Sequence, residues 1–146
     1  MTVRIRIQQE DFGIDVEIKA LRGDDVGAVA TFTGVVRGGD GLAALTLEHY
    51  PGMTECEIER HVAQARSRWP LAGVSIIHRV GRLAPGDNIV LVAVAAARRK
   101  AAFEACEFLM DYLKTRAPFW KREERGGAAH WVEVKASDED AAKKWL

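Results

Sequence analysis

The sequence contains little cysteine and carries no net charge. Its 146 residues include two cysteines, Cys56 and Cys106, which form no CxxC pair. Two cysteines this far apart do not indicate a disulfide framework or a zinc site, and they fit a reduced, cytoplasmic protein. The 21 basic and 21 acidic residues cancel. The chain therefore lacks the excess positive charge with which nucleic-acid-binding proteins neutralise phosphates.

Long apolar runs and familiar catalytic motifs are also missing. No stretch reaches the ~18 apolar residues that a bilayer-spanning helix needs. The alternating start, MTVRIRIQQEDF, lacks the apolar region of a signal peptide. We find no glycine-rich nucleotide-binding loop, no nucleophile elbow and no metal-ligand spacing among the four histidines. These absences predict a single soluble domain of residues 1–146 that binds neither metal, membrane nor nucleic acid.

Alternating apolar and polar residues predict several strands. Val3, Ile5 and Ile7 alternate with arginines, as in a half-buried strand. A second strand is expected over residues 28–36, ending in a glycine-rich loop, and ALTLEHY is expected to pair back across that loop. Residues 12–26 are ambiguous, because their apolar residues alternate although residues 17–21 could form a short helix.

Two longer segments have the apolar spacing and the end signals of helices. Thr54 and Glu57 form a capping-box signature, and apolar residues then follow at helical spacing up to Pro70. The second helix is expected from about Lys100 to Thr115. Its apolar stripe consists of Phe103, Cys106, Met110 and Leu113.

The remaining segments indicate the fold class. Two apolar runs, GVSIIHRVG and DNIVLVAVAAA, are joined by the short loop RLAPGD, which predicts an antiparallel hairpin. The second run is apolar on both faces and is expected to be a central strand. HWVEVKA predicts a late strand, and Ser137 with Asp140 is expected to cap a short terminal helix. The class is therefore α+β with a mixed or mainly antiparallel sheet.

Cations at the ends of these predicted elements are the clearest chemical signal. They are Arg37, Arg98, Arg99, Lys114 and Lys121. A rigid scaffold can aim side chains into a cleft from such positions. Neighbouring cations lower a lysine's pKa, and such a lysine can serve as a general acid or base or as a nucleophile. The residues alone predict a site for a small phosphate or carboxylate, although a single lysine at a helix end more often serves the helix dipole and solubility.

The segment DYLKTRAPFWKREE interrupts the second helix. Pro118 prevents that helix from continuing. We interpret Phe119 and Trp120 as side chains that anchor the turn in the core. Lys121 would then return to the same pocket as Lys114.

Four ordered segments resemble the large, catalytic subunits of molybdopterin synthases. They are FTGVVR, LTLEHYPGMTE, RWPLAGVSIIHRVGRLAPGD and FLMDYLKTRAPFWKRE. The resemblance covers about residues 27–145. It implies an α/β hammerhead-like fold with an additional small antiparallel sheet. It also implies a sulfurtransferase of molybdenum cofactor biosynthesis, which converts cyclic pyranopterin monophosphate into molybdopterin by forming a dithiolene and needs no cofactor.

The same resemblance implies partners. Sulfur would arrive as a thiocarboxylate on the C-terminal Gly-Gly of a small ubiquitin-like sulfur-carrier subunit. The chain would form a homodimer within a heterotetramer. The composition agrees on one point, because the two cysteines, which we interpret as structural, offer no sulfur donor.

Residue by residue, the resemblance makes Lys114 and Lys121 the catalytic lysines. The residues that it implies for substrate binding are Val35, Val36, Arg37, Arg98, Arg99, Lys114, Lys121, Arg122 and Glu123. Arg98 departs from the family, which usually has histidine at this position. This departure favours the alternative function, a non-catalytic module that binds a phosphorylated ligand or a ubiquitin-like tail.

Overall fold

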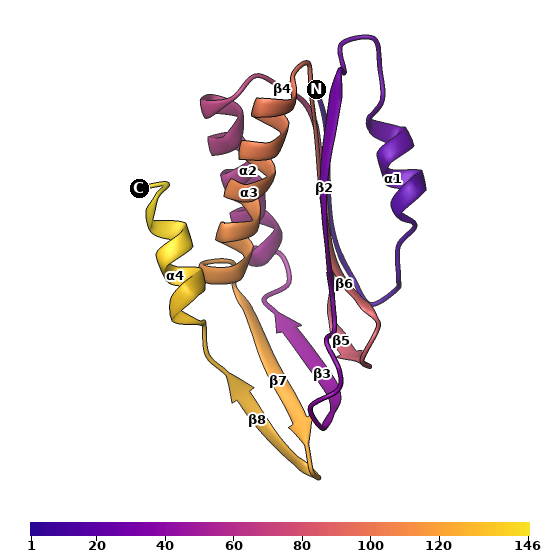
Figure 1. Ribbon diagram of the computed structural model, residues 1–146, viewed down its shortest axis with the longest axis vertical. Helices are drawn as coiled ribbons and strands as arrows, with labels where there is room; N and C mark the ends of the chain where they lie inside the picture. The colour runs from indigo at the N-terminus through magenta and orange to yellow at the C-terminus, as the bar shows by residue number, and fades with distance from the viewer.

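Two four-stranded sheets and four helices make up residues 1–146 of the computed structural model (Figure 1). The first sheet has the order β1-β4-β6-β2. Its strands are β1 (Thr2–Gln8), β4 (Leu71–Arg79), β6 (Asn88–Ala96) and β2 (Ala28–Val35). β1 is parallel to β4 and the other pairings are antiparallel, so the predicted mixed sheet is confirmed.

The second sheet is smaller and entirely antiparallel, with the order β5-β3-β7-β8. Its strands are β5 (Gly81–Leu83), β3 (Leu42–His49), β7 (Phe119–Arg125) and β8 (Ala128–Val132). The additional antiparallel sheet that the family resemblance implied is therefore present. β8 replaces the longer late strand expected over HWVEVKA, because the chain leaves the sheet after Val132.

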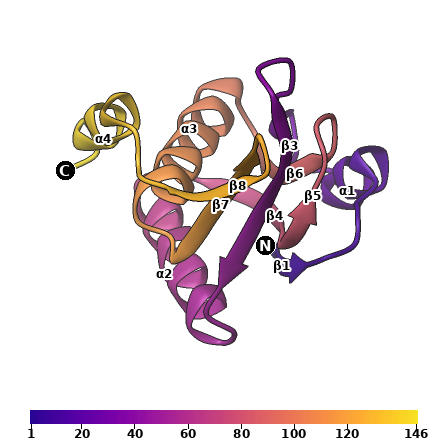
Figure 2. The same cartoon turned by 90° about the horizontal axis from the view of Figure 1, so that it is seen from below.

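Helices cover both faces of the first sheet (Figures 1 and 2). α2 (Met53–Arg68) and α3 (Arg99–Thr115) lie on one face, and α1 (Ile14–Leu21) lies on the other. α4 (Ala136–Lys143) packs against α3. The ambiguous segment 12–26 thus contains a helix. None of these helices combines the length and the apolar character needed to cross a membrane.

The core lies between the first sheet and the pair α2 and α3. All residues of β6 after Asn88 are buried, which confirms β6 as a central strand. The buried face of α3 includes Ala102, Ala105 and Leu109. Phe103 was expected on this face but is 65% exposed, because it lies about 100° further round the helix than Ala102.

The structure corrects the predicted pairing of the segment ALTLEHY. β3 does not pair with β2, which instead pairs with β6 in the first sheet. β3 pairs with β5 and β7 in the second sheet. The chain changes sheets through a loop in which Gly39 and Gly41 have positive φ, a conformation that favours glycine. β5 forms where the run GVSIIHRVG meets the RLAPGD loop, and it provides a partner that the sequence does not suggest.

The helix caps also differ from the prediction. α2 begins one residue before Thr54, after Gly52, and the Glu55 carboxylate accepts a hydrogen bond from the Gly52 N–H at 3.1 Å. Thr54 Oγ1 instead accepts from the Tyr50 N–H at 3.0 Å. The terminal helix α4 is present, but its N-cap is Lys135 and no side chain caps it. The predicted caps Thr54–Glu57 and Ser137–Asp140 are therefore wrong, although both helices form.

A buried carboxylate ties α1 to the first sheet. Glu17 is 3% exposed, and its oxygens lie 3.2 Å from Arg4 Nη1 and 3.8 Å from Arg6 Nη1. Neither oxygen accepts a hydrogen bond, so the two arginines alone compensate its charge. An uncompensated buried charge is strongly destabilising.

We expect Arg4→Met to lower the free energy of unfolding by about 3 kcal/mol, because it leaves the Glu17 charge largely unpaired. Arg6→Met is the matched control. The Arg6 side chain is half exposed and its contact is longer, so its loss should cost less than about 1 kcal/mol. Urea unfolding at pH 7 measures both values. Equal losses in the two variants would show that Arg4 does not provide the main compensation.

Candidate functional site

A cavity of about 120 Å³ lies where the C-terminal end of α3 meets β7 and the segment that follows β8. Figure 1 shows how the lower end of α3 leads directly into β7. The ends of β4 and β6 form the rest of the wall. The lining residues are His78, Ile89, Val90, Met110, Leu113, Lys114, Thr115, Ala117, Phe119, Lys121, Val132, Glu133, Val134, Lys135 and Asp138.

The break at Pro118 brings Lys114 and Lys121 into this one cavity, as the sequence predicted. Phe119 is half-buried and packs against the core. Trp120 does not anchor the turn, because it is 42% exposed and its ring makes an edge contact with Tyr50. Successive residues of a strand point to opposite faces, so Phe119 and Lys121 share the inner face while Trp120 faces outward.

The environment of the lysine pair makes Lys121 easier to deprotonate than an ordinary lysine. Burial, followed by the charge and the close polar contact of Lys114, lowers the pKa of Lys121 to about 8. An ammonium group has three donors and no acceptor, so one amine can accept from the other only when it is neutral. Lys121 can therefore exchange a proton near neutral pH, as a general acid or base must.

His78 is a residue of this cavity that the sequence interpretation missed. Its ring is 5% exposed and stacks on Phe119 with a centroid distance of 3.9 Å. Burial, followed by the charges of Lys121 and Lys114, lowers the pKa of His78 to about 4. The sequence showed only that the four histidines lack metal-ligand spacing. Its position at the end of the apolar run VSII was the one local sign that it would be buried.

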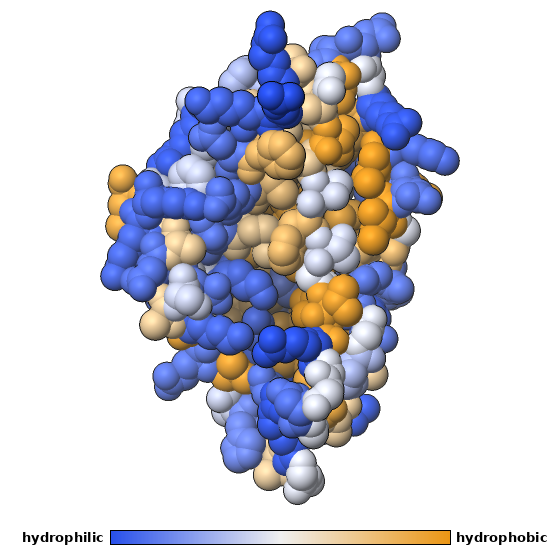
Figure 3. Space-filling model, viewed as in Figure 1, coloured by the Kyte–Doolittle hydropathy of each residue, from blue (hydrophilic) through white to orange (hydrophobic).

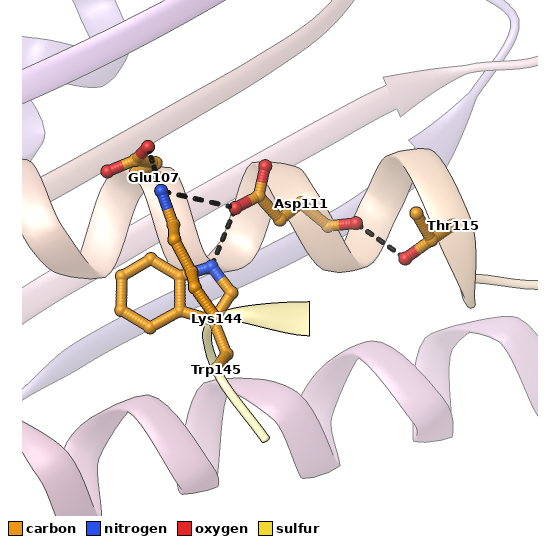
Figure 4. Close-up of polar contacts among 5 residues, drawn as sticks. All are labelled: Glu107, Asp111, Thr115, Lys144 and Trp145. Carbon is orange, nitrogen blue, oxygen red and sulfur yellow. Dashed lines mark hydrogen bonds and ion pairs between the residues drawn. The ribbon is translucent and has the colours of Figure 1, made fainter. Parts of the chain in front are cut away.

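The segment after β8 was also missed. Glu133, Lys135 and Asp138 line the cavity, although no motif marks them. Beyond them, the end of the chain is fixed to α3 by Lys144 and Trp145 (Figure 4). Trp145 Nε1 donates a hydrogen bond to Asp111 Oδ2 at 2.6 Å, and Lys144 forms ion pairs with Glu107 and Asp111. Arg68 of α2 donates a hydrogen bond to the Trp145 carbonyl oxygen at 2.6 Å.

The predicted residues of β7 that follow Lys121 do not line the cavity. Arg122 faces the outer side of the sheet, where its guanidinium lies 5.7 Å from the centre of the Trp131 ring. Glu123 points to the same face as Lys121 but is paired with Arg125 at 2.7 Å.

The predicted residues around the end of β2 lie beside the cavity without lining it. Val36 is buried in the core and Val35 is 49% exposed. The Val36 N–H donates to the Asp87 carbonyl at 2.9 Å, which places Arg37 at the end of the sheet where β6 begins. Ile89 and Val90 of β6 line the cavity at the same end. Arg37 is exposed and forms no ion pair or hydrogen bond within the chain, so its guanidinium is free to bind an anion.

Arg98 and Arg99 lie at the opposite end of α3 from Lys114. Arg98 is the N-cap of the helix and Lys114 is in its last turn. At a rise of about 1.5 Å per residue, roughly 24 Å of helix separates them. A single chain therefore does not bring these arginines to the lysine pair.

The cavity offers no metal site and no thiol. No three His, Cys, Asp or Glu side chains come together in a way that could hold a metal ion. Cys106 is buried under the sheet, where desolvation raises the pKa of its thiol to about 11. Cys56 is exposed on α2, and neither cysteine lines the cavity. Any sulfur chemistry at this site must use sulfur from another molecule.

The volume of the cavity is small compared with that of small-molecule sites, whose volumes are usually at least ~300 Å³. At about 120 Å³ it can hold the end of an extended peptide but not a whole fused-ring ligand. One chain therefore provides only part of the wall that such a ligand would need.

Comparison with known proteins gives a consistent picture. The family model described as MoaE protein matches residues 7–116. The molybdopterin synthase catalytic subunit of Mesorhizobium japonicum is 57% identical over 146 residues, which cover 97% of this chain and 92% of that protein. The solved MoaE protein from Burkholderia ambifaria has a TM-score of 0.85 at 50% identity, covering 99% of this chain and 98% of its own. A complex of subunits 1 and 2 of molybdopterin-converting factor from Helicobacter pylori shares the fold, with a TM-score of 0.73 at 21% identity over 91% of both chains.

Proposed function

The chain belongs to the MoaE protein family, and from this premise we propose how its lysine pair works as the catalytic centre of a molybdopterin synthase. Its relatives are named as catalytic subunits of that enzyme. The reaction that we propose is the conversion of cyclic pyranopterin monophosphate into molybdopterin. One observation carries the proposal: Lys114 and Lys121 share a cavity that contains no thiol. Family membership, with both lysines in place, decides against a non-catalytic binding module.

Sulfur is supplied by a small ubiquitin-like partner subunit that ends in a Gly-Gly thiocarboxylate. The small volume of the cavity supports this, because two glycines have no side chains and can enter a space of about 120 Å³. The positive charge of Lys114 attracts the anionic tail. The subunit complex from Helicobacter pylori shows that a protein of this fold can be solved together with a second subunit.

The lysines divide the chemistry of each transfer. In each transfer the thiocarboxylate sulfur forms a bond to a pterin carbon while a carbon–oxygen bond at that carbon breaks, and the oxygen leaves either with the phosphate or, after protonation, as water. A second water then adds to the tail's carbonyl and breaks the acyl–sulfur bond, which leaves a carboxylate on the tail and a thiolate on the pterin. Lys114, as an ammonium, stabilises the oxyanion that develops on that carbonyl. Lys121, in its neutral form, takes the proton from the attacking water. Two tails are consumed for each dithiolene, and no cofactor is required.

The substrate phosphate is held by arginines around the cavity. Arg37 is the candidate from the same chain, because it is exposed, unpaired and at the same end of the first sheet. An arginine can bind a phosphate through two parallel hydrogen bonds. Val35 and Val36 position Arg37, while Arg122 and Glu123 support the strand that carries Lys121. Both cysteines are free, which fits a reducing compartment, and we place the reaction in the cytoplasm.

A second copy of the chain completes the pocket. β2 is an edge strand of the first sheet, and two of its large apolar side chains, Phe32 and Val35, are 39% and 49% exposed. Figure 3 shows apolar side chains gathered along the middle of the face on which β2 lies. Such an edge favours pairing with another strand. We propose a homodimer in which two β2 strands pair around a two-fold axis.

This arrangement explains the position of Arg98 and Arg99. α3 runs parallel to β2, so antiparallel pairing of two β2 strands sets the two α3 helices antiparallel. The N-terminal end of one α3 then lies near the C-terminal end of the other. Arg98 and Arg99 of one copy thereby approach Lys114 of its partner. Two carrier subunits, one at each pocket, make a heterotetramer.

Mixed dimers test the shared pocket. We expect that Arg99→Ala and Lys114→Ala proteins are each nearly inactive, and that a mixture unfolded and refolded together recovers about a quarter of wild-type activity. Each hybrid dimer then has one pocket with both residues intact. Turnover of the mixture against its separate components measures this. Absence of recovery, while mass spectrometry detects hybrid dimers, would show that both residues act within one chain.

Reconstitution tests the function itself. The purified chain is mixed with pyranopterin and a small subunit carrying a C-terminal thiocarboxylate, and the dithiolene product is measured after oxidation to a fluorescent derivative. We expect product only when the tail carries sulfur. The same subunit with an ordinary carboxylate is the control. No product from an assembled complex with thiocarboxylate would contradict the proposal.

A further inference from the structure

We propose that His78 is a positioning residue for the lysine pair: its unprotonated Nε2 accepts a hydrogen bond from Lys121 when that lysine is in its ammonium form, and so holds the side chain in the cavity. This inference deepens the proposed function, on which its catalytic meaning depends. His78 lies on β4, outside the segments that carry the two lysines. Its part in the site rests on its ring orientation, its burial and its neighbours.

The orientation of the imidazole is fixed on two sides. Nδ1 lies 2.8 Å from the Arg79 carbonyl oxygen. A carbonyl oxygen can only accept a hydrogen bond, so Nδ1 must carry the proton. In a neutral ring, Nε2 is then an acceptor. The Phe119 ring stacks on the imidazole at an interplanar angle of 16°, which prevents the ring from turning.

His78 shares its cavity with the lysine pair. Phe119 and Lys121 are two apart on β7 and project from the same face, so Lys121 leaves the strand beside the ring on which His78 stacks. His78, Lys114 and Lys121 line the same cavity. In the structure Nε2 accepts no hydrogen bond, so this nitrogen is available to Lys121 when the lysine is protonated. A partly buried ammonium group needs hydrogen-bond acceptors, and an unprotonated imidazole nitrogen is one.

Burial first, and the surrounding positive charges second, keep His78 neutral. Lys121 from β7 and Lys114 from α3 oppose its protonation, as does the more distant His49 from β3. No carboxylate is among the groups that act on it. Asp138 and Lys135, from the segment after β8, face Lys121 instead. A ring that stays neutral across the working pH range remains an acceptor throughout.

The consequence for catalysis is that Lys121 keeps a defined place and a pKa near neutrality. Without an acceptor, the ammonium form would lose a charge-assisted hydrogen bond, and the pKa of Lys121 would fall further. About half of the Lys121 side chains would then be neutral at pH 7, but they would no longer be held beside Lys114. Such a role is one of positioning, since His78 reaches the reaction only through Lys121.

Two variants separate the acceptor from the packing. His78→Phe keeps a ring that can stack on Phe119 but removes the acceptor. His78→Gln keeps an acceptor near the position of Nε2. Lysine side chains are labelled with ¹³C at Cε, the Lys121 signal is assigned with Lys121→Arg, and its pKa is measured by NMR titration without substrate or partner.

We expect the pKa of Lys121 to fall by about one pH unit in His78→Phe, the size expected for one lost hydrogen bond to a charged group, and to stay near the wild-type value in His78→Gln. Turnover at pH 7 should fall about tenfold in the first variant and be largely restored in the second. An unchanged Lys121 titration in a folded His78→Phe protein would overturn the inference.

The wild-type protein provides a test that needs no variant. We expect ¹⁵N NMR to show an unprotonated Nε2 and a protonated Nδ1 on His78 at pH 7, and a proton on Nε2 would overturn the inference. Neither titration depends on product formation. If the protein made no dithiolene although the Lys121 pKa responded to His78→Phe, the proposed function would fail while the hydrogen bond to Lys121 would stand.

Discussion

Replacing Lys114 by alanine is expected to lower turnover by about 10²–10⁴-fold while leaving the fold intact. The side chain lies in the last turn of α3, lines the cavity and forms no ion pair with a carboxylate. Its removal therefore leaves no buried charge without a partner. The loss falls on the chemical step, because the ammonium is proposed to stabilise charge that develops during the reaction. Single-turnover product formation measures it, with circular dichroism to confirm the fold.

Lys100→Ala is the matched control for Lys114→Ala. Lys100 lies on the same helix but near its other end, where it pairs with Glu104 at 3.9 Å on the exposed surface. We expect wild-type turnover within about twofold, since an exposed pair of this kind contributes little to stability. If folded Lys114→Ala protein formed product as fast as the Lys100→Ala protein, Lys114 would have no catalytic role.

Lys121→Met is expected to abolish activity and to stabilise the protein. Methionine has a similar length but neither charge nor proton, so turnover should fall at least about 10²-fold. The pKa of Lys121 lies at about 8, below its ordinary value of 10.5, which means that the fold disfavours the charged form. Removing that charge should raise the free energy of unfolding at pH 7 by about 1–3 kcal/mol.

The lowered pKa of Lys121 also makes the free energy of unfolding depend on pH. Between about pH 8 and 10.5 the unfolded lysine still binds a proton that the folded lysine has lost. Stability rises with pH wherever the unfolded state binds more protons, so Lys121 makes wild-type stability rise across this window. The Lys121→Met protein should lack that contribution. Urea unfolding of both proteins at pH 7 and pH 10 measures it, and an equal change in both would show that the Lys121 pKa is not depressed.

Local sequence patterns were sufficient to predict the helix and strand that carry Lys114 and Lys121. The apolar residues of β6 and α3 follow their periods closely, and Pro118 ends the helix for a steric reason that acts within a few residues. Lys114 and Lys121 could therefore be predicted to meet. Trp120 could not be placed by the same reasoning, because its direction depends on β7 being a strand, whose partner β3 is far away in the sequence.

The features that were not predicted depend on long-range pairing or on a second molecule. β3 leaves the sheet of β2 because β5 and β7 offer it a partner, and no local residue indicates this. His78 joins the site only through the packing of β4 against Phe119. Arg98 and Arg99 stand at a helix end, as predicted, but the length of α3 keeps them from the lysines of their own chain.

The source of the sulfur is the most direct test of the central claim, that this chain provides a catalytic cavity and no sulfur. The small subunit is prepared with a ³⁴S thiocarboxylate, and the product of a single turnover by the unlabelled chain is analysed by mass spectrometry. We expect both sulfurs of the dithiolene to carry the label, because Cys106 is buried with a raised pKa and Cys56 lies outside the cavity. An unlabelled sulfur in the product would mean that a cysteine of this chain donates it, and would contradict the claim.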